Sequence, residues 1–288
     1  MNPTRYRTIA VNDLQVFYRE AGAPKGPALL LLHGFPSSSR MWQPLIDRLA
    51  DRYRMIAPDY PGFGHSDAPP ASDFAYTFDR IAEVVEDFTD HIGLDRYTFV
   101  VQNYGGPVGM RLALRRPERA LALIVQNAVC HQGGLGPLWE TRRAFWADRA
   151  RHEAALRENF LSPNASRQRH VGKSPESDRY DPDLWTDELP FLNRPGQPDI
   201  QTDLFYDYRT NVASYPAWQQ WLRDTQPPLL VVWGTYDPSF EVAEAEAYRR
   251  DVPDADVHVI DAGHFALNEA PDLVADLCRQ FLDGLSSQ

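Results

Sequence analysis

The chain has 288 residues, 43% of them hydrophobic, and a formal net charge of −11. This length can bury one large core, or a core with an inserted subdomain. The negative charge argues against a nucleic-acid-binding surface and makes a small molecule the expected partner. No apolar run is long enough to cross a membrane, and the N-terminus lacks the apolar core of a signal peptide. We therefore expect a cytoplasmic protein that does not bind membranes.

The sequence contains two cysteines, Cys130 and Cys278. Because they lie far apart in the sequence, they indicate neither a disulfide framework nor a metal site. We expect no metal and no other cofactor. Association into a homodimer is left open by the sequence.

Segments with the pattern of strands alternate with segments with the pattern of helices, which is typical of an α/β protein with a doubly wound, mostly parallel sheet. The predicted strands, in chain order, are 8–11, 14–20, 28–32, 54–58, 98–102, 122–126, 229–233 and 256–260. A final helix is predicted over 271–282.

Between the strands predicted at 122–126 and 229–233, the sequence becomes rich in Trp, Arg, Pro and Asp. It contains a predicted helical stretch over 139–160 and a loop-like middle over 162–201. The simplest interpretation is a helical cap at 132–225, inserted into an α/β core made of residues 1–131 and 226–288. A separate domain fits less well, because the sheet needs the strands on both sides of the insertion.

Asn103 ends a strand-like run and is followed by Tyr104, two glycines and a helix-like segment. A strand joined to a helix by so sharp a turn is the pattern of a nucleophile elbow, which presents one side chain at the top of a parallel sheet. Gly105 and Gly106 leave the space that such a turn needs. Ser, Cys or Asp is expected at the tip, and asparagine has the shape of aspartate without its charge.

Three further motifs lie where an elbow enzyme needs them. In the loop from His33 to Pro36, the Phe35 N–H can point at the pocket, and with the Tyr104 N–H it would form an oxyanion hole. Asp237 follows a predicted strand and is placed to orient a histidine. His264 follows the last predicted strand and is the candidate general base. The order nucleophile, acid, histidine is that of α/β-hydrolases.

These residues resemble the α/β-hydrolase superfamily over essentially the whole chain. The most similar branch has an aspartate nucleophile and contains epoxide hydrolases and haloalkane or haloacid dehalogenases. Val-Val-Gln-Asn103-Tyr-Gly-Gly resembles the dehalogenase elbow Val-Val-Gln-Asp-Trp-Gly-Gly. The loop from Asp59 to Asp67 resembles one that both groups carry, and His-Gly-Phe-Pro at 33–36 is closer to epoxide hydrolases and fluoroacetate dehalogenases.

In that branch the resemblance implies a two-step reaction. A carboxylate attacks a saturated carbon, and histidine-activated water then hydrolyses the alkyl ester while the oxyanion hole receives the developing charge. Mapped onto this chain, position 103 is the nucleophile, His264 the base and Asp237 its partner. Phe35 and Tyr104 provide the N–H donors.

The leaving group separates the sub-branches. An epoxide oxygen needs a proton donor, and Tyr208 lies in a stretch that resembles the Tyr-Arg-x-Asn segment of epoxide hydrolases. A second cap tyrosine is not evident before Tyr180. A halide needs N–H donors, commonly a Trp after the nucleophile, where this chain has Tyr104. Trp146 could donate from the cap, and Trp139 is a further candidate for binding the substrate or leaving group.

Three hypotheses follow. The first is a hydrolase that opens an epoxide, or alternatively a haloalkane or haloacid dehalogenase, disabled at Asn103. We favour a deliberate replacement of aspartate, which would let substrate bind while attack is slowed. The second is a natural binding protein on a hydrolase scaffold. The third is an esterase or lyase that uses His264 without a covalent step.

Overall fold

The computed structural model describes residues 3–285. These residues form an eight-stranded sheet with the order β1-β2-β4-β3-β5-β6-β7-β8. Strand β2 is antiparallel to both β1 and β4, and the remaining neighbours are parallel. The strands are β1 (Arg5–Val11), β2 (Leu14–Ala21), β3 (Ala28–Leu32), β4 (Arg54–Pro58), β5 (Tyr97–Gln102), β6 (Ala120–Gln126), β7 (Leu229–Gly234) and β8 (Asp256–Ile260). The predicted α/β fold is confirmed, and each predicted strand agrees with an observed one to within a few residues.

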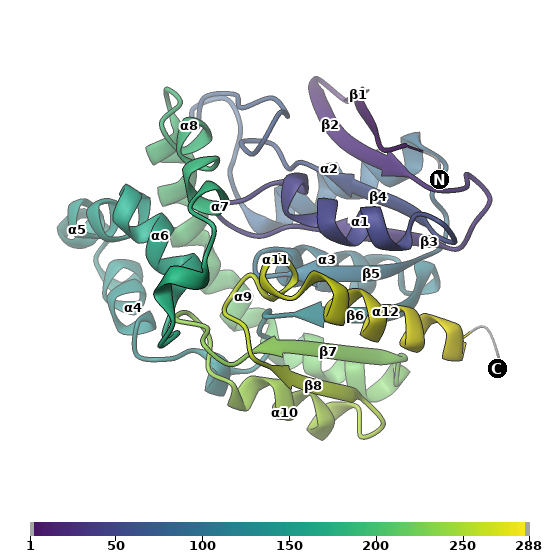
Figure 1. The fold of residues 1–288 in the computed structure, drawn as a ribbon. Coiled ribbons are helices and arrows are strands. Elements are labelled where there is room, and N and C mark those ends of the chain that lie inside the picture. The colour runs from purple at the N-terminus through teal and green to yellow at the C-terminus, as the bar shows by residue number, and fades with distance from the viewer. Residues whose placement is uncertain (1–2, 286–288) are drawn as a thin grey trace.

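Helices cover both faces of the sheet (Figure 1). Alternate residues of β3 enter different hydrophobic clusters: Leu30 and Leu32 belong to one, and Leu29 and Leu31 to the other. The first cluster is completed by α2 (Phe78–His91), α3 (Gly105–Arg115) and α10 (Ala243–Asp251), and the second by α1 (Gln43–Leu49), α11 (Ala266–Glu269) and α12 (Pro271–Leu285). Because both faces are covered, β5 and β7 are buried along their whole length, which explains their continuous apolar sequence.

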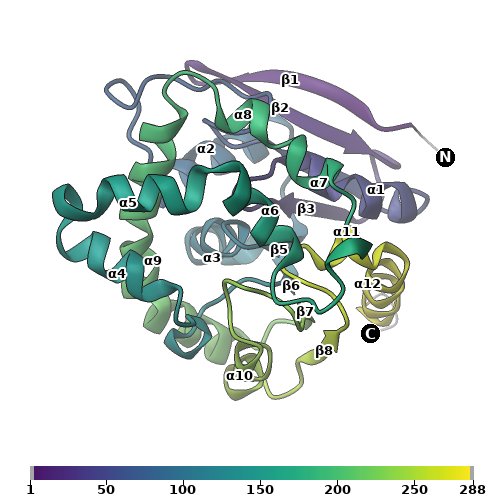
Figure 2. The same cartoon turned by 60° about the vertical axis from the view of Figure 1, so that its left-hand side comes forward.

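Strands β6 and β7 are neighbours, with Leu123 paired with Leu229, although a long stretch of chain separates them. That stretch contains α4 (Trp139–Ala147), α5 (Arg149–Leu161), α6 (Pro163–Val171), α7 (Asp183–Thr186), α8 (Leu189–Leu192) and α9 (Gln197–Thr225). We call these the inserted helices. Helices α4 to α8 are grouped at the end of the sheet toward which β7 points (Figures 1 and 2).

The helical stretch predicted over 139–160 is observed, but Asp148 divides it into α4 and α5, and the Asp148 side chain accepts the Arg151 N–H at the start of α5. Another expectation for this segment was wrong. The stretch 162–201, predicted as loop, contains α6, α7, α8 and the start of α9. The loop was predicted from its prolines. Pro163, Pro190 and Pro198, however, lie in the first turn of helices, where proline costs no hydrogen bond.

Candidate active site

Asn103 lies between β5 and α3 with a backbone φ of 49°, which is the left-handed conformation expected at a sharp elbow. At Gly105 and Gly34, any larger residue would clash with neighbouring atoms. A Cβ at Gly105 would lie 1.9 Å from the Leu32 carbonyl oxygen, and one at Gly34 would lie 2.3 Å from the Asn103 Cβ. The elbow and the loop after β3 therefore pack backbone against backbone, which brings the two predicted N–H donors close to position 103.

Both predicted N–H donors point at the Asn103 side chain. Its Oδ1 accepts hydrogen bonds from the N–H of Phe35 at 3.1 Å and of Tyr104 at 2.8 Å. The oxygen held in this way belongs to the candidate nucleophile itself. In an enzyme that forms an ester at this position, the same oxygen would carry the negative charge when water attacks.

His264 and Asp237 are completely buried and joined by a 2.7 Å contact between Nδ1 and Oδ2. The second carboxylate oxygen, Oδ1, accepts the N–H groups of Ser239 and Phe240 at 2.7 and 3.1 Å. Nε2 of His264 has no hydrogen-bond partner among the described residues. Asp237 therefore fixes the orientation of the His264 ring, and Nε2 of His264 remains available to a water molecule.

Asn127, a residue that the sequence analysis missed, ties the acid to the elbow. It follows β6, and its Nδ2 donates to Asp237 Oδ2 at 2.7 Å. Its Oδ1 accepts the Gly234 N–H at 3.0 Å, and its backbone carbonyl accepts the Asn103 N–H at 3.2 Å. One residue thus fixes the position of the acid, the end of β7 and the nucleophile.

A narrow cavity lies above the elbow. It is lined by Phe35, Asn103, Tyr104, Trp139, Arg142, Arg169, Phe205, Tyr208, Ser239 and Phe240. The structure therefore brings the elbow and oxyanion residues together with two of the three predicted substrate-binding residues, Trp139 and Tyr208. Trp146 is not part of the lining, although its ring is stacked parallel to that of Tyr208 at 6.4 Å.

The ring N–H groups of Trp139 and Trp146 form hydrogen bonds with the protein, whereas the hydroxyl of Tyr208 does not. Trp139 donates its ring N–H to the Ser239 carbonyl at 2.8 Å, and Trp146 donates to the Phe205 carbonyl at 2.7 Å. Tyr208 is buried, and its hydroxyl makes no hydrogen bond of normal geometry among the residues described, although the Tyr215 hydroxyl is near enough to affect its pKa. Burial raises the pKa of Tyr208, so it remains a neutral phenol that can donate a hydrogen bond.

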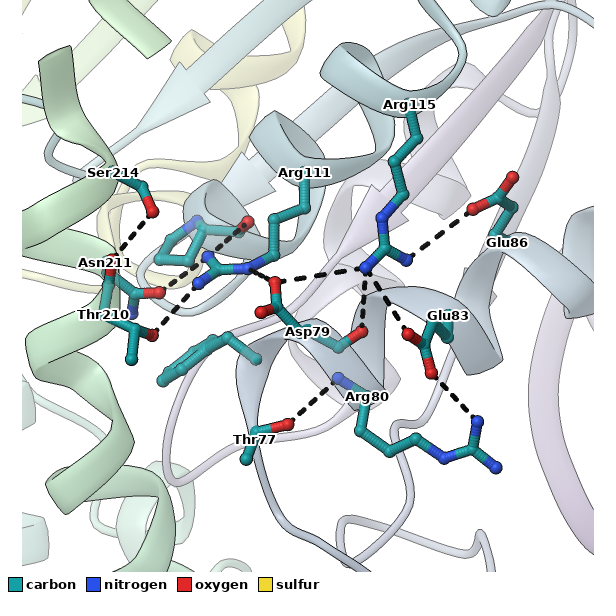
Figure 3. A network of polar contacts seen from close by, with 12 residues as sticks. Thr77, Asp79, Arg80, Glu83, Glu86, Arg111, Arg115, Thr210, Asn211 and Ser214 are labelled. Carbon is teal, nitrogen blue, oxygen red and sulfur yellow. Dashed lines mark hydrogen bonds and ion pairs between the residues drawn. The ribbon is translucent and has the colours of Figure 1, made fainter. Parts of the chain in front are cut away.

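Arg111 on α3 holds α9, the helix that carries Tyr208, against the core (Figure 3). Its guanidinium contacts Asp79 at 2.6 Å, the Asn211 side-chain oxygen at 2.7 Å and the Thr210 hydroxyl at 3.1 Å. The Tyr-Arg-Thr-Asn stretch therefore has a structural function besides carrying Tyr208: its last two residues bind the helix that follows the elbow.

In the part of the chain that the structure describes, one group of side chains is close enough together to hold a metal ion. A ligand atom of each of Cys130, His131 and Glu244 lies within 4.8 Å of the others. Glu244 Oε1, however, already accepts the N–H groups of Cys130 and His131 and contacts His131 Nδ1. The other ring nitrogen of His131 contacts Asp251 at 2.8 Å. These hydrogen bonds account for the proximity of the three side chains without a metal ion.

An elbow beside a buried acid–histidine pair, on a mostly parallel sheet, defines an α/β-hydrolase. The sequence matches the family described as alpha/beta hydrolase fold over residues 27–271, and the chain therefore belongs to this family. It is 40% identical over 269 residues to the "Uncharacterized hydrolase YNR064C" of Saccharomyces cerevisiae, covering 91% of this chain and 92% of that protein. It is 42% identical over 113 residues to haloalkane dehalogenase 2 of Mycobacterium tuberculosis, which is 39% of this chain and 38% of that protein.

Solved structures share the fold. The epoxide hydrolase CorEH superposes with a TM-score of 0.80 at 18% identity, covering 98% of this chain and all of that one. The haloalkane dehalogenase DbeA of Bradyrhizobium elkani superposes with a TM-score of 0.78 at 21% identity, covering 99% of each chain. No helix in residues 3–285 is long and apolar enough to span a membrane.

Proposed function

We propose that this chain is built to open an epoxide through an alkyl–enzyme ester at position 103, and that Asn103 disables the attack while leaving the binding site intact. The observation that carries the proposal is that the Phe35 and Tyr104 N–H groups hold Oδ1 of residue 103. An esterase would need these donors for a carbonyl oxygen of its substrate. Here they are placed for the oxyanion of an ester formed on the protein.

With aspartate at position 103, one carboxylate oxygen attacks an epoxide carbon and the ring C–O bond breaks. The ring oxygen takes the proton of Tyr208. His264 Nε2 then takes a proton from water, whose oxygen adds to the ester carbonyl carbon. The bond between this carbonyl carbon and the ester oxygen that carries the alkyl group then breaks, and the departing oxygen takes the proton from His264. The new carboxyl group returns a proton to the Tyr208 phenolate through solvent, so that epoxide and water give a diol.

The free hydroxyl of Tyr208 favours an epoxide over a halide as the leaving group. A departing alkoxide needs a proton, and Tyr208 lines the cavity with its hydroxyl unpaired. A halide needs N–H donors, and those of Trp139 and Trp146 are bonded to backbone carbonyls. The inserted helices then act as a cap that places the proton donor over the elbow.

Dehalogenation is the second candidate, favoured by the 42% identity over 113 residues to a protein named haloalkane dehalogenase 2. A non-catalytic binding protein is the third, favoured by asparagine at the nucleophile position. One experiment separates the three. The Asn103→Asp variant is incubated with a panel of epoxides and a panel of alkyl halides, and diol and halide are measured.

We expect diol formation from epoxides, with the original Asn103 protein slower by orders of magnitude. Halide release without diol formation would assign the chain to dehalogenases. An Asn103→Asp variant that is inert on both panels, while it binds the same compounds as the Asn103 protein, would favour the binding protein.

A further inference from the structure

Two arginines of the inserted helices lie where the inner cavity meets a larger one. Arg142 on α4 and Arg169 on α6 line the cavity above Asn103. Both also line a larger outer cavity, formed mainly by residues of α4, α5 and α6. Their exposed fractions are 6% and 7%. The two arginine side chains therefore lie between the elbow and the outer cavity.

Neither arginine has an acidic partner among the described residues. The Nε and Nη1 atoms of Arg142 and the Nη1 atom of Arg169 are buried without a hydrogen-bond partner. Within residues 3–285, the one hydrogen bond made by either group is from Arg169 Nη2 to the Phe160 carbonyl at 2.6 Å. Burying a charge without a partner costs several kcal/mol or more, so the arrangement is unfavourable unless something else compensates it.

Aromatic rings lie next to the guanidinium groups of Arg142 and Arg169. The Arg142 guanidinium lies 4.0 Å from the Trp139 ring centre and 4.5 Å from that of Phe160, and Arg169 lies 4.4 Å from that of Phe35. Such contacts stabilise a cation modestly and leave its N–H groups unpaired. Burial lowers the pKa of each arginine to about 10, so both remain charged near neutral pH.

Arg111 shows how this chain treats a buried arginine that has a structural role. It is as deeply buried, at 6% exposed, yet its guanidinium reaches a carboxylate, a side-chain amide oxygen, a hydroxyl and a backbone carbonyl. Of the carboxylates near the other two arginines, Asp237 contacts His264, and Glu188 contacts His170 through Oε1 while its Oε2 has no hydrogen-bond partner among the described residues. Arg142 and Arg169 therefore line the cavity with N–H groups that form no ion pair within residues 3–285.

We infer that Arg142 and Arg169 bind the carboxylate of an anionic substrate, and that the epoxide of the proposed reaction carries this group. The inference rests on the proposed function for the identity of the reacting group. A carboxylate is planar, accepts several N–H groups, and supplies the charge that the pair lacks. With the carboxylate at the arginines, the rest of a small substrate extends toward Tyr208 and Asn103, which line the same cavity.

The test compares glycidate, a small epoxide with a carboxylate, with glycidamide, its neutral amide. Binding to the Asn103 protein is measured by isothermal titration calorimetry. We expect glycidate to bind at least about tenfold more tightly. Arg142→Gln and Arg169→Gln should each weaken glycidate binding by about 10- to 100-fold, because a hydrogen bond to a charged group contributes roughly 1.5–3 kcal/mol. Glycidamide binding should hardly change.

Two neighbouring arginines provide matched controls. Arg143, on the same helix as Arg142, is exposed, and Arg167 on α6 is half-buried against Trp185. Arg143→Gln and Arg167→Gln should leave glycidate binding unchanged. If a glutamine variant does not fold, Arg142→Met keeps the apolar stem of the side chain while removing the charge, and the same loss of glycidate binding is expected.

Three results would overturn the inference. The first is equal binding of glycidate and glycidamide to the Asn103 protein. The second is an equal loss of both in the arginine variants, which would indicate a structural role. The third is competition by bromide against glycidamide that disappears in the arginine variants, which would indicate a site for a leaving halide. Because binding needs no turnover, an Asn103→Asp variant that stays inert would refute the proposed function and leave the preference for a carboxylate standing.

Discussion

Asn127 donates a 2.7 Å hydrogen bond to the same carboxylate oxygen of Asp237 that His264 contacts. A second donor on this oxygen fixes its direction while the carboxylate still carries the charge that stabilises a histidine cation. Asn127 itself is held by the Gly234 N–H. The acid of the site is thus positioned from β6 as well as from its own loop.

The Asn127→Gly substitution tests this positioning role. Glycine is chosen because Asn127 has a φ of 43°, a conformation that strains most other residues. In the Asn103→Asp background, we expect ester hydrolysis to slow by about 10- to 100-fold, from the loss of one hydrogen bond to a charged group. The pH profile of hydrolysis should shift, since the support of the histidine cation changes. Asn193→Ala, at an exposed residue after α8, is the control, and an unchanged pH profile in Asn127→Gly would argue against the role.

Removal of the Tyr208 hydroxyl should distinguish the leaving groups. In the Asn103→Asp background, Tyr208→Phe should reduce the rate of epoxide opening by about 10²- to 10⁴-fold, the usual contribution of general-acid help. Halide release from an alkyl halide should change little. Tyr206→Phe is a matched control, because Tyr206 is half-buried on the same helix and does not line the cavity. Stopped-flow measurement of the first turnover isolates this step, and an unchanged epoxide rate would remove Tyr208 from the mechanism.

The contact between Arg111 and Asn211 should stabilise the fold. Asn211 is completely buried and accepts a hydrogen bond from Arg111 at 2.7 Å. We expect Asn211→Ala to lower the free energy of unfolding by about 1.5–3 kcal/mol, as for other hydrogen bonds to charged groups. Ser214→Ala, one turn further along α9 (Figure 3), should change it by about 0.5 kcal/mol or less. Urea denaturation of both variants measures the difference, and similar values for the two would contradict the account.

His33 should make the fold less stable in mild acid. Burial lowers the pKa of His33 from 6.5 to about 4, and its Nε2 accepts the Tyr60 N–H at 3.3 Å, which requires an unprotonated nitrogen. As the pH falls below 6.5, His33 becomes protonated in the unfolded chain but stays neutral in the folded protein. The folded state therefore loses stability until the pH reaches about 4, by about 3 kcal/mol in total.

His131 complicates the overall pH dependence, because its pKa is raised: burial lowers it, but the hydrogen bond and charge of Glu244 outweigh this effect. The stability that His131 contributes is present below pH 6.5 and is lost as the pH rises. The difference between the original protein and His33→Gln isolates the His33 contribution. We expect the stability of the original protein relative to this variant to fall between pH 6.5 and 4. A constant difference over that range would show that His33 is not held neutral.

The sequence allowed the sheet and the elbow to be predicted because each depends on local patterns. Buried parallel strands are continuous apolar runs, and Gly105 is demanded by the 1.9 Å approach to the Leu32 carbonyl. Asp237 and His264 could be chosen as the candidate acid and base because each follows a strand, and parallel strands end at one edge of the sheet. The pairing of these two side chains in the structure agrees with that selection.

Other features depend on tertiary contacts that no local pattern reveals. Arg142 and Arg169 look like ordinary helical arginines, which are mostly exposed, and only the packing of the inserted helices buries them. The direction of the Trp139 and Trp146 N–H groups is likewise set by backbone carbonyls from distant segments. Asn127 is a single polar residue at the end of a strand, and its role follows only from its position beside Asp237.

The most direct test of the central claim is to trap the ester at position 103. The double variant Asn103→Asp with His264→Gln keeps the nucleophile and removes the base, so attack should proceed while hydrolysis stalls. After addition of an epoxide that the Asn103→Asp variant turns over, intact-protein mass spectrometry should show the protein mass increased by the mass of one epoxide. Peptide mapping should place the adduct on residue 103. Steady diol formation by the double variant without any adduct would contradict the account.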